Sequence, residues 1–269
     1  MTRDWTAIRA VLAKDVLAVR RSKAVVLPML IVPFLLLVVL PLAIGLAALS
    51  SDPPGVGGFL EAVPARLRDV IRDLPQRQQL LVLVDGYLLA PLFMIVPLMV
   101  ASVLAADAFA GEKERKTLEG LLHLPIGERD LFYAKVGGAF LPAMAVSWIG
   151  FAQFVVVANA IGWGVMHRPF LPTRLWMVMM AWVAPAVAAL GMGVMVRVSA
   201  RARTTQEANQ LGGAVVLPLI FLVVGQSTGL LLVELPVVVA AGAVVWAIAL
   251  WLLHRGATRF TRDAMLEAA

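Results

Sequence analysis

The sequence has no cysteine and little charge. Only 15% of its 269 residues are Asp, Glu, Lys or Arg, against about 25% in soluble domains. The absence of cysteine excludes a disulfide framework and thiol chemistry. Three histidines, His123, His167 and His254, lie far apart and lack the spacing of a helical zinc site. The sequence therefore argues against a membrane metalloprotease.

A phosphate-binding loop is also missing, because no glycine-rich stretch ends in Gly-Lys-Ser or Gly-Lys-Thr. We expect the chain to bind no nucleotide or other cofactor itself. Charge inside the apolar runs is equally scarce, and Asp85, Asp107 and Glu234 lie only at their ends. Ion-coupled carriers usually place an ionisable group within the bilayer, so this pattern favours an external energy source.

Long apolar runs make up most of the chain, and 61% of all residues are hydrophobic. A hydrocarbon core about 30 Å thick needs roughly 20 apolar residues per helix. We predict an all-α polytopic membrane protein with one transmembrane domain, residues 24–254, that has six transmembrane helices. The predicted spans are 24–49, 84–106, 136–160, 175–196, 211–232 and 235–254. A turn near residue 225 instead of residue 235 would make the fifth segment re-entrant, and both alternatives stay open.

Basic residues fall mainly in the segments that connect these runs. Of 23 Lys and Arg, 17 lie in residues 1–23, 107–135, 197–203 and 255–269, which six spans place on one side. The positive-inside rule makes that side, with both termini, cytoplasmic. We therefore expect a multi-pass protein of a bacterial cytoplasmic membrane. The net charge of +6 reflects topology and not a nucleic-acid partner.

Three segments outside the spans have their own patterns. Residues 1–23 alternate apolar and basic positions at helical spacing and predict a cytoplasmic interfacial helix, or a simple basic lead-in; the run that follows is too long for a cleavable signal. The outer loop, residues 50–83, predicts an amphipathic helix that rests on lipid or caps a pathway. Residues 255–269 form a cytoplasmic tail.

The cytoplasmic loop 107–135 is the most informative stretch. It contains a charged helix with a leucine edge that ends at Pro125, and a second polar segment follows the fourth span at residues 199–210. A charge run is usually solvated, but an apolar edge favours burial against membrane or protein. We predict a docking surface from both segments, made of Glu112, Lys113, Glu114, Arg115, Lys116, Thr117, Leu118, Glu119, Leu122, Arg201 and Glu207.

Both segments resemble a known family. Gly-Glu-Lys-Glu-Arg at 111–115, Thr-Leu-Glu at 117–119 and Leu-Pro-Ile at 124–126 are similar to the signature of ABC-2 type permeases, especially the group of the sodium-exporter permease NatB. Lys116 departs from the glycine usual there. The resemblance implies a type V exporter fold with six spans and an N-terminal interfacial helix. It also implies a homodimer that binds two copies of a separate ABC ATPase, which carries the ATP and Mg²⁺, so that the segments above transmit ATPase closure to the spans.

Two other functions stay open, a secondary carrier or channel that needs no ATP, and an anchor for a cytoplasmic enzyme. Neutral polar side chains inside the spans are weak candidates for a substrate pathway, although such groups more often satisfy a neighbouring helix. These candidates are Gln153, Asn159, Gln226 and Ser227. A largely neutral interior suits an amphipathic or lipid-like cargo at least as well as a sodium ion.

Overall fold

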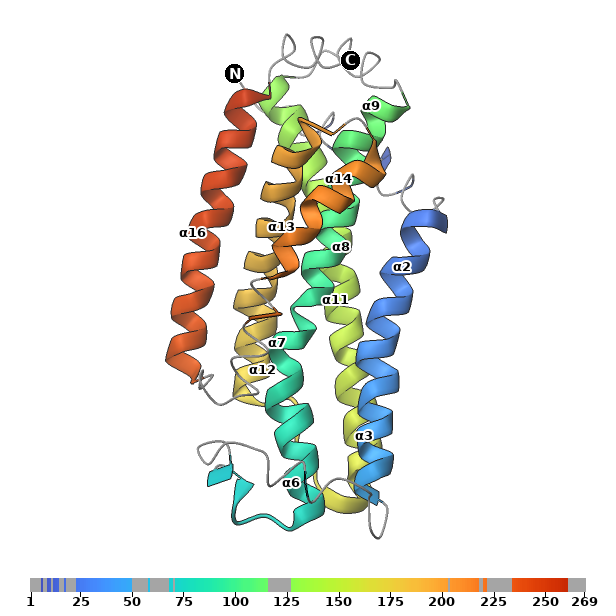
Figure 1. The fold of residues 1–269 in the computed structure, drawn as a ribbon, viewed down its shortest axis with the longest axis vertical. Helices are drawn as coiled ribbons and strands as arrows, with labels where there is room; N and C mark the ends of the chain where they lie inside the picture. Colours follow the sequence, from blue (N-terminus) through green and yellow to red (C-terminus); the bar gives the residue numbers. More distant parts are fainter. Residues whose placement is uncertain are drawn as a thin grey trace.

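The computed structural model describes residues 23–49, 71–115, 127–202, 204–217 and 234–260, with isolated residues 6, 9, 10, 12–14, 17, 58, 68, 69, 220 and 221. Within that part of the chain every regular element is helical, and the helices form an elongated bundle (Figure 1). Residues 116–126 lie outside the described residues, as do most of the predicted interfacial helix, most of the outer loop up to residue 70 and most of the predicted span 211–232.

Five long helical segments run along the bundle. Their elements, in chain order, are α2 (Lys23–Phe34), η1 (Leu35–Val39) and α3 (Leu40–Leu49); α6 (Gln76–Leu83), η2 (Val84–Leu88), α7 (Leu89–Phe93), α8 (Ile95–Ala106), η3 (Asp107–Gly111) and α9 (Glu112–Glu114); α11 (Glu128–Met166); α12 (Arg174–Val178), η4 (Met179–Val183) and α13 (Ala184–Ser199); and α16 (Leu235–Arg259). Two shorter elements, α14 (Thr205–Gly212) and η5 (Gly213–Val216), lie beside α8 and α13.

Five of the six predicted spans correspond to helices long and apolar enough to cross a membrane. These are Met29–Leu49, Gln76–Glu114, Glu128–Met166, Arg174–Ser199 and Leu235–Thr258. The second and third each have 39 residues, or about 58 Å at about 1.5 Å per residue, far more than a hydrocarbon core of about 30 Å. The described parts of the predicted loop 107–135 therefore continue the membrane helices instead of forming a separate loop.

The core lies where α8, α11, α13 and α16 meet, with α13 between α8 and α16 (Figure 1). Small residues let these helices approach closely, as is common in membrane bundles. A Cβ atom on Gly191 would lie 2.7 Å from Ser102 Oγ of α8, and one on Gly193 would lie 2.8 Å from the Cβ atom of Leu252 of α16. The first span joins through α3 and η1, which contact α11.

Four segments of the long helices are π-helical, and three of them precede a proline. Pro41 follows η1, Pro91 follows η2 and Pro185 follows η4 within three residues. A proline ring clashes with the carbonyl four residues earlier in an α-helix, and in each case that carbonyl lies in the π-helical segment. The wider turn relieves the clash. No proline follows η3 before residue 125, so η3 needs a different cause.

Candidate functional site

The two polar segments that the sequence singled out meet at one end of the bundle. There η3 and α9 lie beside the start of α11, the end of α13 and α14 (Figure 1). We call the joined side chains the α9 junction, and the next paragraphs describe its contacts. Its members are Asp107, Glu112, Lys113, Glu114, Arg115, Lys135 and Thr205.

A buried ion pair forms the centre of the α9 junction. The Lys135 ammonium of α11 is fully buried and forms an ion pair with Glu112, which is 4% exposed. Lys135 Nζ also donates to the Ala108 carbonyl in η3 at 2.9 Å. Lys14 of the N-terminal segment approaches the other Glu112 oxygen at 2.9 Å. A carbonyl in the widened turn thus helps to satisfy the buried ammonium, which accounts for η3 without a proline.

The exposed side of α9 holds the second polar segment. Lys113 Nζ donates to the carbonyls of Ser199 and Ala200, each at 3.1 Å, at the end of α13. The Glu114 carboxylate accepts from both the backbone N–H and the hydroxyl of Thr205, each at 2.9 Å. Glu114 therefore places a negative charge at the first turn of α14, where the helix dipole favours it.

The first turn of α14 also has its own cap. The Thr204 hydroxyl accepts from the Glu207 backbone N–H at 3.1 Å, and the sequence Thr-x-x-Glu at 204–207 is the capping-box pattern. The start of α14 is therefore held both by its own cap and by Glu114 of α9.

A third contact closes α9 onto η3. Arg115 Nη1 donates to Asp107 Oδ1 at 3.0 Å, and this hydrogen bond raises the pKa of the guanidinium further above its ordinary value. Gly111 fits between them, since a Cβ atom there would lie 2.8 Å from Asp107 Oδ1 and 3.2 Å from Thr205 Oγ1. A side chain at residue 111 would therefore displace the side-chain ends of Asp107 and Arg115 from their present positions.

Aromatic rings support the α9 junction from the side of the bundle. Phe109 of η3 packs against Phe132 of α11 and Phe260 after α16, with ring centroids 5.9 Å apart in both pairs. Lys135 Nζ lies 5.7 Å from the centroid of the Phe109 ring. The α9 junction thus joins η3, α9, α11, the end of α13 and α14, and the rings add a contact to Phe260 after α16.

The structure distributes the predicted docking residues over different environments. Glu114, Arg115 and Arg201 are exposed, whereas Lys113 and Glu207 are half-buried. Glu112 differs most from its expected place on the outer charged face, because its carboxylate turns inward to Lys135. Sequence spacing cannot show this pairing, since the two residues are separated by 23 positions. Lys116, Thr117, Leu118, Glu119 and Leu122 lie outside the described residues.

Of the four weak candidates for a substrate pathway, the structure describes Asn159 and Gln153. The Asn159 amide donates to the carbonyls of Val155 and Leu171, and its oxygen accepts from the N–H groups of Phe170 and Leu171. These bonds use the hydrogen-bonding capacity of Asn159 in full. Gln153 is exposed on α11, and Gln226 and Ser227 lie outside the described residues.

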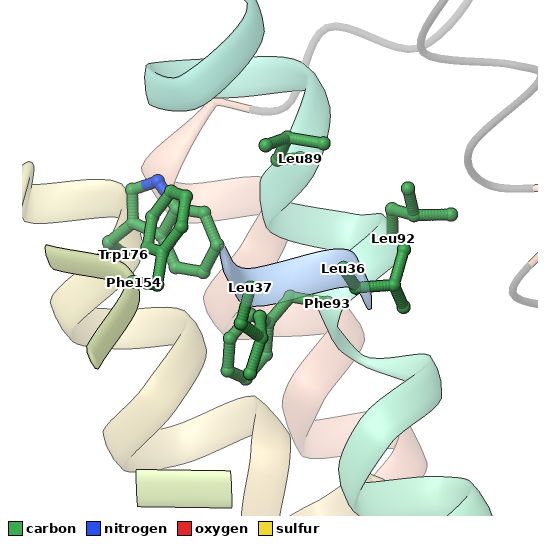
Figure 2. A pocket seen from close by; sticks show the side chains of 7 residues that line it. All are labelled: Leu36, Leu37, Leu89, Leu92, Phe93, Phe154 and Trp176. Carbon is green, nitrogen blue, oxygen red and sulfur yellow. The ribbon is translucent and has the colours of Figure 1, made fainter. Parts of the chain in front are cut away.

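An apolar pocket lies between the first, second, third and fourth predicted spans. Leu36, Leu37, Leu89, Leu92, Phe93, Phe154 and Trp176 line it. Figure 2 shows Trp176 and Phe154 together on one side and Leu36 and Leu92 on the other. The ring centroids of Trp176 and Phe154 lie 4.8 Å apart. The pocket brings together leucines and rings distant in sequence, so sequence analysis did not identify it.

One buried carboxyl group departs from the neutral interior that the sequence indicates. Asp85 was expected at the end of an apolar run, but the helix begins nine residues earlier, at Gln76, and encloses it. Asp85 is fully buried, and neither carboxylate oxygen has a hydrogen-bond partner within the described part of the chain. Its backbone carbonyl accepts from Trp176 Nε1 at 2.8 Å, which links it to the wall of the pocket.

Comparison with known protein families agrees with this arrangement. The family model described as "ABC-2 family transporter protein" matches residues 9–251. Comparisons with curated proteins and with solved structures gave no match. The matched region includes both segments of the α9 junction and every candidate span except the last residues of the fifth. The chain, a multi-pass membrane protein, therefore belongs to the ABC-2 family of transporter proteins and is the membrane component of such a transporter.

Proposed function

We propose that the chain is the permease subunit of an exporter, and that the α9 junction is where a separate ABC ATPase acts on it. Family membership implies an ATPase partner. The observation that carries the proposal is that α9 contacts α13 and α14 through Lys113 and Glu114 and α11 through Glu112. A force on this one short helix reaches several membrane helices at once.

The exposed and the buried charged groups at this end of the bundle have different roles. Arg201 is not part of the α9 junction but belongs to the same predicted docking surface. Glu114, Arg115 and Arg201 lie at the surface, where charges fix the register of a partner more than the affinity. Glu112 and Lys135 lie inside and hold α9 rigidly to α11. ATP-driven closure changes the state of the spans only if the ATPase binds one arrangement better than the other. Because a rigid α9 junction moves together with the spans, its exposed groups would be placed differently for the ATPase in the two arrangements.

We further propose six spans, cytoplasmic termini in a bacterial inner membrane, and a homodimer that binds two ATPase subunits, as in the NatB-like group. The interfacial helix of residues 1–23 then lies at the end of the bundle where the α9 junction is. Lys14, which contacts Glu112 at 2.9 Å, supports that placement. We also propose an amphipathic or lipid-like cargo, which the largely neutral composition of the predicted spans supports.

Charge reversal at exposed positions tests the docking surface. Candidate ABC ATPases are co-purified with the wild-type chain and with Arg201→Glu, whose side chain makes no contact recorded in the structure. We expect Arg201→Glu to lower ATPase recovery and permease-stimulated ATP hydrolysis together, without a change in the melting temperature of the permease. Arg168→Glu is the matched control, because Arg168 is exposed beyond the opposite end of α11.

Two results would contradict the proposal. Unchanged recovery and stimulation in both Arg201→Glu and Arg115→Glu would remove the α9 junction from the ATPase interface. Cargo movement by the purified chain alone, in liposomes without ATPase, would favour a secondary carrier or channel.

A further inference from the structure

Two arginines from different helices meet at one tryptophan ring near the end of α16. The Arg255 guanidinium carbon lies 4.5 Å from the centroid of the Trp251 ring, and that of Arg197 of α13 lies 5.9 Å from it. Both arginines are exposed, and neither has an ion pair with any acidic residue that the structure describes. The two positive charges beside one ring repel each other, so an anion bound between them lowers the electrostatic energy.

The surrounding sequence is mainly basic, and the acidic residues Glu207 and Asp263 follow only after these basic runs. Residues 197–206 contain Arg197, Arg201 and Arg203 without an acidic residue, and residues 254–262 contain Arg255, Arg259 and Arg262 without one. Basic segments at a membrane surface attract anionic lipids. Local charge therefore favours a negatively charged ligand over a neutral one.

An apolar stripe leads along α16 to this pair. Val244, Ile248 and Trp251 are 59%, 45% and 49% exposed, and with Arg255 they follow the spacing of one helix face. Arg255 lies eleven positions after Val244, an axial distance of about 16 Å along the helix. This is close to the depth of one leaflet in a hydrocarbon core of about 30 Å. An exposed apolar stripe of this length that ends at two cations matches an acyl chain with its headgroup.

The shape of the site distinguishes lipid from a soluble partner. A cytoplasmic protein would meet the arginines but not the stripe, which runs into the part of α16 that is apolar enough to cross the membrane. Trp251 also has the amphipathic ring that is enriched at membrane interfaces. The end of α16 lies at the same end of the bundle as α9 (Figure 1).

We propose that Arg197, Trp251 and Arg255 form a binding site for the phosphate headgroup of an anionic phospholipid, with its acyl chain on the Val244–Ile248 stripe of α16. The two guanidiniums hold the phosphate, and the tryptophan ring keeps them close together. This site is separate from the α9 junction and does not depend on the proposed ATPase interface.

Energy transfer from tryptophan to a pyrene-labelled lipid tests the site on the full chain, purified and reconstituted in phosphatidylcholine vesicles. Pyrene-phosphatidylglycerol is the probe, and pyrene-phosphatidylcholine is the neutral comparison. We expect the wild type to enrich the anionic probe only. Loss of one arginine weakens that enrichment about fivefold, since one basic residue near a membrane surface contributes about that factor. Arg197→Gln/Arg255→Gln should therefore abolish most of it.

Two matched double variants distinguish lipid binding at this site from nonspecific attraction of anionic lipid by surface charge. Arg168→Gln/Arg174→Gln removes two exposed arginines, one just after the end of α11 and one at the first residue of α12, and should leave enrichment unchanged. Arg197→Lys/Arg255→Lys keeps the charge and should retain most of it. Equal enrichment of both probes by the wild type, or full enrichment by Arg197→Gln/Arg255→Gln, would overturn the proposal. So would complete displacement of the lipid probe by inorganic phosphate at equal concentration, because the stripe would then contribute nothing.

Discussion

At the scale of single residues, Lys135 is the most consequential side chain. It is the one lysine among the largest fully buried side chains of the described residues, and it contacts Glu112, the Ala108 carbonyl and the Phe109 ring. The sequence shows Lys135 only as the last charge before an apolar run. Its partner lies 23 positions earlier across an unpredicted π-helical turn, so no spacing rule could identify the pair.

Removal of Lys135 takes the buried cation away from the buried Glu112 carboxylate and leaves it the half-exposed Lys14; breaking a buried ion pair in this way costs up to about 3–5 kcal/mol. We expect Lys135→Met to lower the free energy of unfolding by about that amount, measured by denaturant titration of the purified chain in detergent. The double variant Lys135→Met/Glu112→Gln should recover more than half of the loss, because no buried charge remains. Lys14→Met is the control; its side chain is 51% exposed, so it should cost less than about 1 kcal/mol. Additive losses in the double variant would show that the two residues do not interact.

At the scale of elements, α14 depends on α9 for its start. Glu114 bonds two groups of Thr205, and the loss of such a cap costs about 1 kcal/mol. In Glu114→Ala we expect amide hydrogen exchange in α14 to be about fivefold faster, measured by mass spectrometry. Glu234→Ala is a suitable control, because Glu234 precedes α16 without a side-chain capping bond. Unchanged exchange in Glu114→Ala would mean that α14 is held by its packing alone.

A second element-scale prediction concerns the contact between α8 and α13. A Cβ atom on Gly191 would lie 2.7 Å from Ser102 Oγ and 3.1 Å from the Leu98 carbonyl oxygen, so the two helices must separate to admit it. We expect Gly191→Ala to lower stability by about 1–3 kcal/mol, with a lower melting temperature in detergent. Gly213→Ala, where nothing lies within 4 Å of the added atom, should be neutral or slightly stabilising. Similar melting temperatures for the two variants would contradict close packing at Gly191.

The long helices show what sequence can and cannot predict at this scale. Five spans follow from charge-free runs alone, because bilayer thickness fixes their minimum length. Their true ends do not, since Gln76–Leu83 and Glu128–Lys135 carry charges that a helix beyond the hydrocarbon tolerates. The π-helical turns at Leu35–Val39 and Met179–Val183 are also not given by the length of the apolar runs, because they depend on clashes between proline rings and preceding carbonyls. Of the α9 junction, the sequence singled out Glu112 to Arg115 but not Asp107, Lys135 or Thr205, and it did not indicate how these residues pair.

At the scale of the whole molecule, α11 separates the α9 junction from Arg168 by the full thickness of the membrane. Its 39 residues form one helix about 58 Å long at about 1.5 Å per residue, which exceeds any bilayer core. Lys135, in the first turns, contacts the α9 junction, and Arg168 follows the other end. Glu114 and Arg168 must therefore face opposite sides of the membrane.

The lack of native cysteine makes this arrangement directly measurable. We expect Arg168→Cys to react with a membrane-impermeant maleimide on intact cells, because the positive-inside rule predicts that the α9 junction faces the cytoplasm. Glu114→Cys and Arg201→Cys, both at exposed positions, should react only after the cells are permeabilised. The unsubstituted chain is the background control, since it has no thiol to label. Labelling of Glu114→Cys on intact cells would place the α9 junction outside, where no cytoplasmic ATPase could reach it, and coupling at this surface would then be physically impossible.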